Sequence, residues 1–376
     1  MNASSIHSVV ELCQALVQIP SENPSGSPSS RGEEAMARFV GEFLEQTGAR
    51  VEYEEIEPGR PNVYGVWPAP PGATQRILFA PHLDTVTVEG MTVDPFQGSC
   101  RDGKLYGRGS CDTKGSIAAM LWALKSVDLS KLSVAVSFAG LMDEEFEQRG
   151  AKACAVRKMA DFVIAGEPTN LNVVHIHKGT AWIRIETSGK AAHASVPENG
   201  VNAIDRMTEA LAILRDRFLE ICPVQPHPIL GRPTLSTGRI SGGSKINVIP
   251  DHCYAEVDIR ILPGQESIMT GITDFLKSQR SPAVVTPIKI SPPLFTAPDN
   301  PFVRRLLELG SSLTGASWFC DAAMFAHEGI PAIAIGPGSI VQAHTADEFI
   351  EIAELHRGAK FFTNYLLSFD HGRLKN

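Results

Sequence analysis

Five short segments with histidine or carboxylate side chains are spread over most of the chain, and each follows or interrupts an apolar run. They are His82-Leu83-Asp84, Asp112 in a Gly-rich turn, Asp143-Glu144-Glu145, Glu167 and His344. Such positions are typical of loops at strand ends, where a rigid scaffold can direct several side chains to one point. Imidazole and carboxylate groups are the ligands that zinc and related metals prefer. The pattern therefore predicts an α/β scaffold with a two-metal site at its strand ends.

The length and charge of the chain limit the classes of protein to which it can belong. At 376 residues it is too long for one typical core, so two domains are expected. Hydrophobic residues make up 43% and charged residues 20%, as in an ordinary globular protein. The formal net charge of −8 argues against nucleic acid or an anionic membrane as a partner. No apolar run approaches the ~18 residues that a membrane span needs.

The N-terminal segment and the cysteines favour a cytoplasmic protein. Residues 1–20 carry Glu11 within their apolar part and lack a basic leader, which predicts an amphipathic helix rather than a signal peptide. The seven cysteines are scattered and form no C-x-x-C pair, which fits a reducing compartment. Most are expected to be small buried hydrophobic residues. Cys111 adjoins Asp112, so packing beside a metal site and packing in an ordinary core are both open interpretations there.

Three short apolar runs in the first part of the chain predict buried strands, and each ends at one of the five segments. The runs are 76–80 before His82, 134–141 before the acidic segment 143–145, and 162–165 before Glu167. Ligands at the carboxyl ends of strands are what an open α/β sheet predicts.

Further signals in this part predict an edge strand and a helix. Alternation at 51–56 predicts the strand, and Ser30 with Glu33 predicts a capping box for a helix that ends near Gly48.

A different rhythm in residues 178–291 predicts an inserted domain. Its strand and helix patterns follow one another in the order β-α-β-β-α-β, which is the ferredoxin-like signature. Residues 1–177 and 292–376 are expected to form the other domain, because the last part of the chain returns to the first pattern. The inserted segments are 181–187, 201–218, 234–240, 253–261, 266–280 and 284–290, and later helices are expected at 301–314 and 348–367 with a strand at 332–335.

Each motif has an ordinary structural explanation when it is taken alone. Asp112 beside glycines is more often turn chemistry, and the acidic segment 143–145 more often a solvated turn. As a functional segment, one of its carboxylates would bind metal while its neighbour acts as general base. His175 and His177, two apart on a strand, could bind a metal together, but core or surface histidines are the better interpretation. Function is favoured because the motifs occur together.

Taken together, the motifs resemble those of the co-catalytic zinc amidohydrolases, a family that includes acetylornithine deacetylase, succinyl-diaminopimelate desuccinylase, aminoacylase and glutamate-releasing carboxypeptidases. The resemblance runs through almost the whole chain in order and spacing. It implies a zinc-peptidase-like catalytic domain, whose mixed central sheet is flanked by helices, and an inserted ferredoxin-like α+β lid or dimerisation domain. The anchors are 81–86, 106–115, 143–145, 166–168, 190–195, 247–250 and the segment around His344.

The resemblance assigns a role to each ligand of the metal site. It implies that His82 and Glu167 bind one zinc, whereas Glu145 and His344 bind the other. Asp112 is then the bridge between the two metals. Zinc is expected on this ground, although cobalt and manganese also suit such nitrogen and oxygen ligands.

The resemblance also assigns the residues that act on the substrate. Asp84 would support His82, and Glu144 would be the general base. His193 of the inserted domain would donate to the oxyanion, in this family often in the site of a partner subunit. Asn247 would be a second polar contact to the reacting group. Arg260 would clamp the substrate carboxylate, a task for which bidentate arginine is suited.

Within the family, the loop from Gly336 to Ile340 and the segment before His344 are most similar to the acetylornithine deacetylase branch. Gly338 and Ser339 of this loop are therefore expected to contact substrate. One departure concerns Asp321-Ala322, because that branch tends to have Thr-Glu there.

The expected function is metal-dependent hydrolysis of the amide bond of an N-acyl-amino acid by a homodimer that forms through the inserted domain. Alternatives within the family are a desuccinylase, a carboxypeptidase or a dipeptidase that acts on a short peptide. A non-catalytic binding homologue is a more distant alternative. A missing ligand or a replaced Glu144 would be its mark, and the sequence has neither.

Overall fold

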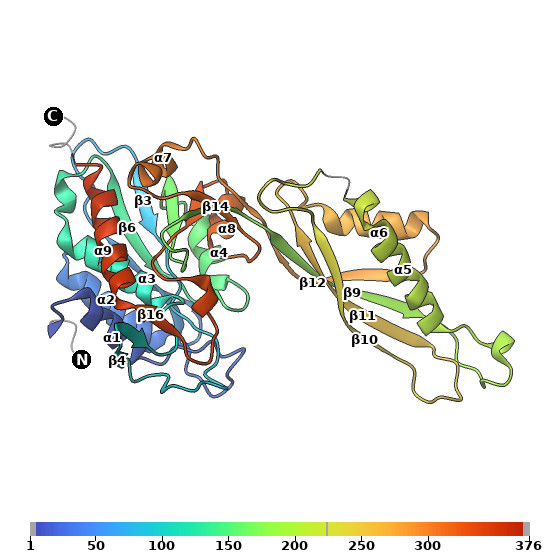
Figure 1. Ribbon diagram of the computed structural model, residues 1–376. Coiled ribbons are helices and arrows are strands. Elements are labelled where there is room, and N and C mark those ends of the chain that lie inside the picture. Colours follow the sequence, from blue (N-terminus) through green and yellow to red (C-terminus); the bar gives the residue numbers. More distant parts are fainter. Residues whose placement is uncertain (1–4, 223–224, 371–376) are drawn as a thin grey trace. The chain divides into compact units, whose positions relative to one another are not determined.

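The structure is a computed structural model that describes residues 5–222 and 225–370 (Figure 1). It divides into two compact units. Unit 1 runs through Ile176 and takes up Phe295–Thr314 and the chain from Cys320 onward, whereas unit 2 comprises His177–Leu294 and the short segment Gly315–Phe319. In the part of the chain that is described, no helix is both long and apolar enough to cross a membrane.

Unit 1 is built on a nine-stranded sheet, and this sheet is mixed, as the family resemblance implied. The strand order is β1-β2-β6-β3-β7-β15-β8-β13, with β14 paired to β8. Strands β6, β3, β7 and β15 run parallel, whereas β1 and β2 extend the sheet in antiparallel fashion. The strands are β1 (Arg50–Glu57), β2 (Arg60–Val66), β3 (Arg76–Phe79), β6 (Ala135–Gly140), β7 (Phe162–Ala165), β8 (Val173–His177), β13 (Leu294–Phe295), β14 (Leu313–Ala316) and β15 (Ala332–Ala334).

Helices bury their apolar faces against this sheet and form one continuous core with it. Helix α3 packs against both α1 and α9 (Figure 1), and α4 packs against α8. Phe79 of β3 meets Phe362 of α9 edge to face, with ring centroids 5.5 Å apart, a favourable arrangement for buried aromatic rings. The helices are α1 (Val9–Val17), α2 (Glu34–Gln46), α3 (Lys114–Ser126), α4 (Arg149–Val156), α7 (Pro301–Glu308), α8 (Ala322–His327) and α9 (Ile352–Leu367).

The parallel strands bring three of the five segments to one edge of the sheet. His82 follows β3, the acidic segment 143–145 follows β6, and Glu167 follows β7. Strand β3 lies between β6 and β7, so all three loops emerge side by side at the carboxyl ends. The predicted strands 76–80, 134–141 and 162–165 are therefore confirmed, together with their use as a platform.

A small three-stranded sheet brings the other two segments together. Its order is β16-β5-β4, with β4 at Cys100–Arg101, β5 at Lys104–Tyr106 and β16 at Phe349–Glu351. Strands β5 and β16 are antiparallel, and Tyr106 pairs with Phe349. The end of β5 therefore lies beside the start of β16, which places the loop of Asp112 next to the loop of His344.

Three local predictions for unit 1 were wrong. No side chain caps α2, because Ser30 donates its hydroxyl to Glu22 O and Glu33 binds Arg60 instead. The helix expected at 301–314 ends at Glu308, and β14 follows it. The final helix begins at 352 rather than 348, because 349–351 pairs with β5. The helix expected within residues 1–20 is α1, and residues 1–4 lie outside the described chain.

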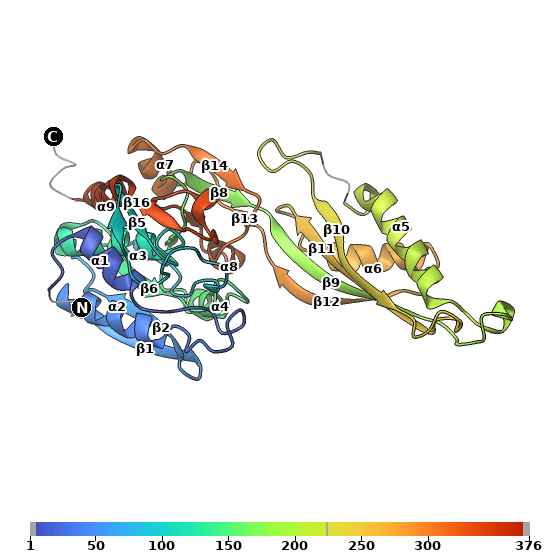
Figure 2. The same cartoon turned by 60° about the horizontal axis from the view of Figure 1, so that its bottom comes forward.

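Unit 2 has the predicted ferredoxin-like arrangement. Its antiparallel sheet has the order β10-β11-β9-β12, and α5 and α6 lie together on one face of it (Figures 1 and 2). Alternate residues of β9, such as Ala181 and Ile183, are buried under these helices. The elements are β9 (Gly179–Ser188), α5 (Ala203–Ile221), β10 (Thr234–Gly242), β11 (His252–Ile261), α6 (Ile268–Ser278) and β12 (Val284–Ser291).

Candidate metal centre

The predicted ligands meet in unit 1 as overlapping groups of possible metal-binding atoms. One group is His82, Asp112 and Glu167, and a second is Asp112, Glu145 and His344. Within each group the ligand atoms lie within 4.8 Å of one another. Asp112 belongs to both groups, as a bridging ligand would. Glu144 comes close in a third group, with His82 and Glu145.

The carboxylate of Asp112 lies between two histidine rings. Its Oδ1 is 3.2 Å from Nε2 of His82, and its Oδ2 is 3.4 Å from Nε2 of His344. His344 Nε2 also lies 3.3 Å from Glu145 Oε1. Each oxygen of one carboxylate thus faces a different imidazole, which is the arrangement that a carboxylate shared by two cations requires.

His82 is oriented by the backbone of Asp84. Nδ1 of His82 lies 3.0 Å from the carbonyl oxygen of Asp84, an acceptor, so the proton belongs on Nδ1. The lone pair of Nε2 then points toward Asp112, as is usual for a metal-binding histidine. The carboxylate of Asp84 accepts the N–H groups of Glu144 at 3.0 Å and Glu145 at 3.1 Å. Asp84 therefore positions two segments of the site.

Glu348 holds the Asp112 loop, and the sequence did not reveal it. One oxygen of this fully buried carboxylate accepts the N–H groups of Cys111 at 2.9 Å and Asp112 at 3.0 Å. The other accepts Arg108 Nη1 at 2.7 Å and Gly109 N at 3.0 Å. Arg108 could have indicated that a buried acid is needed here, because a buried cation needs a counter-ion. The sequence does not show which acid, since Glu348 lies far away along the chain.

The electrostatics of the site call for positive charge. Burial raises the pKa of the Glu144 and Glu167 carboxyls well above the ordinary value, against the attraction of His82. Hydrogen bonds to Asp112 and Glu145 raise the pKa of His344 to about 10. Protons or divalent cations can supply the missing charge, and nitrogen and oxygen donors in this number suit the latter. The residues therefore fit a pair of metal ions.

Asp321 is another acid beside this cluster that the sequence did not assign to it. It is almost fully buried, and burial raises the pKa of its carboxyl to about 7. Gln148 Nε2 donates to Oδ1 at 3.4 Å, whereas Oδ2 finds no hydrogen-bond partner among the described residues. The departure of Asp321-Ala322 from the Thr-Glu pattern therefore adds a buried carboxyl group close to Glu144 and Glu167.

Two histidines that might have formed a separate metal pair are core residues. Both are buried on β8, and they occur in none of the candidate metal groups among the described residues. Nδ1 of His175 lies 2.9 Å from Thr296 O, and Nδ1 of His177 lies 2.8 Å from Lys178 O. Burial lowers the pKa of His177 to about 4.

Gly338 and Ser339 lie against the Asp112 loop. Gly338 has φ 84°, and a Cβ there would come within 2.7 Å of Cys111 Sγ. Cys111 is fully buried, and its thiol donates to Ser339 O at 3.4 Å. Cys111 therefore packs the Asp112 loop against the loop of Gly338.

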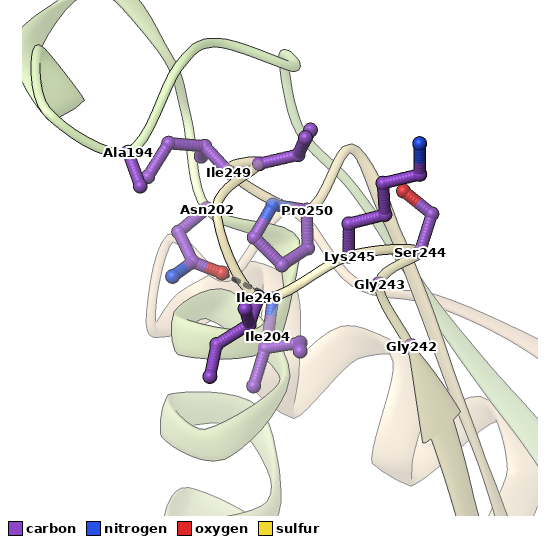
Figure 3. Close-up of a pocket in the computed structure, with 11 residues that line it drawn as sticks. Ala194, Asn202, Ile204, Gly242, Gly243, Ser244, Lys245, Ile246, Ile249 and Pro250 are labelled. Atoms are coloured by element: carbon purple, nitrogen blue, oxygen red, sulfur yellow. Dashed lines mark hydrogen bonds between the residues drawn. The ribbon is translucent and has the colours of Figure 1, made fainter.

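His193 and Asn247 lie on adjoining exposed loops of unit 2. The backbones of the two loops are hydrogen-bonded to each other. Ala194 N donates to Asn247 O at 3.1 Å, and His193 and Val248 form an isolated antiparallel β-bridge. Ser195 N donates to Nδ1 of His193 at 3.2 Å, so the ring proton belongs on Nε2. A pocket beside these loops is lined by Ala194, Asn202, Ile204, 242–246 and 248–250 (Figure 3).

Arg260 is the penultimate residue of β11 and lies on the face of the sheet opposite α5 and α6. Its Nη2 donates to Asp258 Oδ2 at 2.9 Å, and its guanidinium lies 5.9 Å from the Phe319 ring centroid. Like His193 and Asn247 it belongs to unit 2, so the roles of all three residues stay predictions.

Comparison with known proteins gives consistent findings. The sequence model of peptidase family M20/M25/M40 matches residues 78–368. Acetylornithine deacetylase of Photorhabdus laumondii is 31% identical over 98% of this chain and 98% of its own. A tripeptidase of Staphylococcus aureus superposes with a TM-score of 0.78 at 23% identity, over 96% of this chain and 98% of that chain.

A Bacillus subtilis protein described as a dinuclear metal binding peptidase from the M20 family has the same fold. It superposes with a TM-score of 0.70 at 14% identity, over 96% of this chain and 97% of that chain. Both units of the present chain are therefore covered by proteins of known structure, and the resemblance inferred from the motifs is confirmed.

Proposed function

The chain belongs to peptidase family M20/M25/M40, and from that premise we propose that it hydrolyses the amide bond of N-acyl-α-amino acids with the help of two divalent cations. Membership of the family makes it a metal-dependent amide hydrolase. The observation that carries the two-metal proposal is the carboxylate of Asp112, whose two oxygens face His82 and His344.

The two groups of ligand atoms define the proposed metal positions. His82, Asp112 and Glu167 would hold one cation, and Asp112, Glu145 and His344 the other. Zinc is the proposed metal, with cobalt and manganese as alternatives that suit the same donors. When bound, the pair of cations would lower the pKa of a water molecule, so that it could lose a proton near neutral pH and attack a carbonyl. The cations would also polarise that carbonyl.

Glu144 is the proposed general base and acid. It follows β6 in the same loop as the ligand Glu145, and its N–H is held by Asp84 at 3.0 Å. Its carboxyl is buried in a candidate group with His82 and Glu145, so it lies where it could take up a proton from water and release it to the leaving amine.

Residues of unit 2 are proposed to bind the substrate. His193 carries its proton on Nε2, so this nitrogen can donate to the developing oxyanion, and Asn247 on the adjoining loop can add a second donor. Arg260 is proposed to bind the substrate carboxylate. Its guanidinium would then give up its hydrogen bond to Asp258 and donate to the substrate instead. In unit 1, Gly338 and Ser339 are proposed to contact the acyl-amino acid from the loop after β15.

The two units are proposed to act as a catalytic domain and a lid. In this proposal residues 178–291 form the lid, and residues 1–177 with 292–376 form the catalytic domain. Closure of a lid excludes water and completes an active site. A homodimer through the lid, with His193 supplied to the partner, remains part of the proposal.

The proposed substrate class is that of the similar deacetylases, N-acetyl amino acids such as N-acetylornithine. A second candidate is a peptidase or a desuccinylase. Asp321 favours it, because the acetylornithine deacetylase branch tends to have Thr-Glu where this chain has Asp321-Ala322. The proposed setting is cytoplasmic amino-acid metabolism, as the scattered cysteines of the sequence and the similarity to acetylornithine deacetylases suggest.

A substrate panel tests the proposal. Zinc-loaded protein is incubated with N-acetylornithine, N-succinyl-diaminopimelate, other N-acetyl amino acids and dipeptides, and amine release is measured. The proposal expects release from N-acetyl amino acids, loss of release after chelation and recovery with zinc. Cleavage of dipeptides alone would favour the second candidate, and no cleavage of any amide would reject both.

A further inference from the structure

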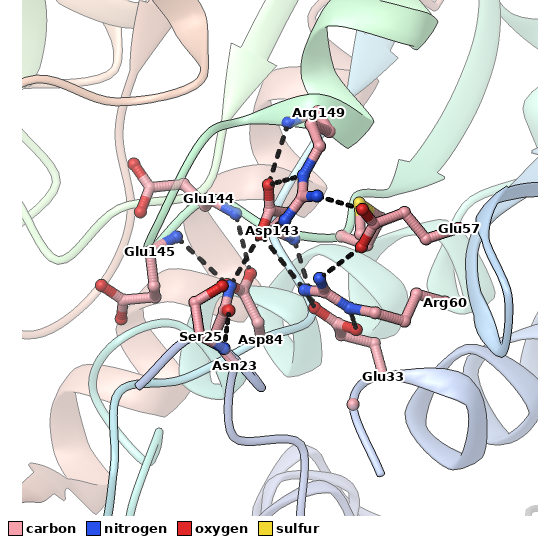
Figure 4. A network of polar contacts seen from close by, with 12 residues as sticks. Asn23, Ser25, Glu33, Glu57, Arg60, Asp84, Asp143, Glu144, Glu145 and Arg149 are labelled. Carbon is pink, nitrogen blue, oxygen red and sulfur yellow. Dashed lines mark hydrogen bonds and ion pairs between the residues drawn. The ribbon is translucent and has the colours of Figure 1, made fainter. Parts of the chain in front are cut away.

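A cluster of charged side chains surrounds Asp143, the first residue of the acidic loop 143–145. None of the proposed catalytic steps uses this cluster. Asp143 and Glu33 are fully buried, and Arg60 is nearly so. Ions are seldom kept this deep in a protein unless they are paired, because their desolvation is unfavourable. The cluster consists of Glu33, Glu57, Arg60, Asp143 and Arg149 (Figure 4).

The carboxylate of Asp143 is the centre of the cluster. Arg149 donates to it from Nε at 2.6 Å and from Nη2 at 3.1 Å. Arg60 donates from Nη2 at 3.2 Å, and the N–H of Glu147 adds a contact at 3.3 Å. Two guanidinium groups therefore surround one carboxylate, and Glu57 pairs with both of them from outside.

The backbone of Asp143 is held together with its side chain. The residue has φ 71°, in the left-handed region that residues other than glycine seldom adopt. Its N–H donates to Glu33 Oε1 at 3.3 Å, and Glu33 in turn accepts Arg60 Nε at 2.8 Å and Nη2 at 2.6 Å. In Figure 4, Glu144 and Glu145 leave this turn on the side away from the two arginines.

Asn23 links the cluster to the metal centre. Its amide nitrogen donates to Asp143 Oδ1 at 3.0 Å and to Asp84 Oδ2 at 2.8 Å. Asp84 accepts the N–H groups of Glu144 and Glu145 at 3.0 and 3.1 Å. A continuous set of hydrogen bonds therefore runs from the arginines to the backbone of both glutamates (Figure 4).

We propose that Arg149 and Arg60 act through Asp143 as positioning residues, which fix the strained turn from which Glu144 and Glu145 project. The inference rests on the proposed function, because it takes Glu144 as general base and Glu145 as metal ligand. The ion pairs of both arginines are with acids other than the proposed metal ligands. Their contribution is to keep the buried carboxylate of Asp143 paired and its backbone in the left-handed conformation.

Loss of one arginine should relax the turn and move both glutamates. Displacement of a catalytic group by about 1 Å can lower the rate by about 10²-fold. Loss of an outer-shell partner typically lowers metal affinity or activity by roughly 10- to 100-fold. Arg149 is the better site for the test, because its side chain is 28% exposed and its replacement disturbs the core less than that of Arg60.

The experiment compares Arg149→Gln with Arg157→Gln. Arg157 is a matched control, because its side chain is 27% exposed and it pairs with two glutamates, Glu52 at 2.8 Å and Glu54 at 3.3 Å, away from Asp143. Zinc affinity is measured by titration calorimetry of the metal-free proteins, and kcat and KM are measured on the best amide of the substrate panel. Arg149→Gln should weaken zinc binding and lower kcat, each by roughly 10- to 100-fold, with KM within about twofold. Arg149→Lys should recover part of both losses, and Arg157→Gln should match the wild type.

Asp143→Asn tests whether the effect passes through Asp143. If it does, the double variant Arg149→Gln/Asp143→Asn should have the kcat of Asp143→Asn alone. Independent losses that multiply would overturn the proposal. Hydrogen exchange of the Glu144 and Glu145 amides gives a reading without catalysis, and it should be faster in Arg149→Gln than in Arg157→Gln.

The outcomes separate this inference from the proposed function. If wild-type protein cleaves no amide, the proposed function fails, and zinc affinity and hydrogen exchange still test the positioning role. If Arg149→Gln keeps the zinc affinity, exchange rates and kcat of Arg157→Gln, the positioning role is overturned and the function stands.

Discussion

The two units differ in how they present their functional side chains. In unit 1 the candidate residues come from five separate segments, converge at strand ends and contact one another, as His82, Asp112 and His344 do. In unit 2, His193 and Asn247 are exposed on loops. Their hydrogen bonds are local, since His193 bonds Ser195 and the carbonyl of Asn247 accepts the N–H of Ala194.

This difference teaches which kind of site a chain reveals by itself. A buried metal centre is a set of charged groups that would be unfavourable without a cation, so its chemistry identifies it. Exposed substrate-binding residues are stable without their ligand and resemble any polar loop. Their roles were therefore accessible through family resemblance alone. The variants below test whether unit 2 is as necessary for the reaction as unit 1.

The largest effect is expected for Glu144→Gln in unit 1. Loss of the general base should lower kcat by roughly 10²- to 10⁴-fold, while both metals stay bound because the ligand groups are intact. Glu42→Gln on α2 is the control, because Glu42 is exposed and belongs to none of the candidate metal groups in the described chain. Steady-state kinetics and elemental analysis check this, and retention of more than about a tenth of the wild-type kcat would remove Glu144 from its role.

His193→Ala should have the next largest effect and would show that unit 2 takes part in catalysis. Loss of an oxyanion donor typically lowers kcat by roughly 10²- to 10³-fold. Metal content and thermal stability should not change, because the ring is exposed. His252→Ala, at an exposed histidine of β11, should behave like the wild type. An unchanged kcat in His193→Ala would contradict its role.

Mixing two inactive chains tests whether His193 acts in a partner subunit. In a hybrid of His193→Ala and Glu144→Gln chains, one of the two sites would combine an intact Glu144 with an intact His193. Random exchange of subunits should then restore about a quarter of the wild-type activity, since half of the dimers are hybrids with one working site. No recovery after proven exchange would place His193 in its own subunit's site.

Arg260→Lys should affect binding more than chemistry. Lysine keeps the charge but loses the bidentate fork, so KM should rise by roughly tenfold with a smaller change in kcat. Wild-type protein should discriminate against the carboxamide analogue of the substrate, and Arg260→Lys should discriminate less. Arg239→Lys on the neighbouring strand β10 is the control. Equal KM values in the two variants would exclude Arg260 as the carboxylate clamp.

The smallest effect concerns stability at the start of unit 2. Burial lowers the pKa of His177 to about 4, whereas an unfolded chain binds that proton near pH 6.5. The unfolded state therefore holds more protons between these values, so the free energy of unfolding falls as pH falls from 6.5 toward 4, by at most about 1.4 kcal/mol per pH unit. His177→Asn should show a shallower decline in urea unfolding over this range. An identical slope would mean that His177 does not titrate as a buried neutral residue.

Much of the fold followed from local patterns, because strand and helix periodicities are written into consecutive residues. The strand at 162–165 and the β-α-β-β-α-β order of unit 2 are examples. Local patterns failed where a distant partner decided the outcome. Residues 349–351 continue a helical pattern but pair with β5, and Glu33 binds Arg60 instead of capping α2.

The same limit applies to the site. The clustering of the candidate ligands was predictable because each imidazole or carboxylate segment follows or interrupts an apolar run. Asn23, Glu348 and Asp321 were not, because their function depends on contacts with residues far away in sequence, such as Asp84 for Asn23 and the Asp112 loop for Glu348. Local patterns and the family resemblance both point to the candidate ligands, whereas three-dimensional contacts are needed to find the residues that support them.

Anomalous X-ray diffraction at the zinc edge, on crystals of the zinc-loaded protein, tests the central claim most directly. The account predicts two anomalous peaks per chain, one bounded by His82, Asp112 and Glu167 and the other by Asp112, Glu145 and His344. A single peak away from Asp112, or zinc bound elsewhere while these side chains remain bonded to one another, would contradict it.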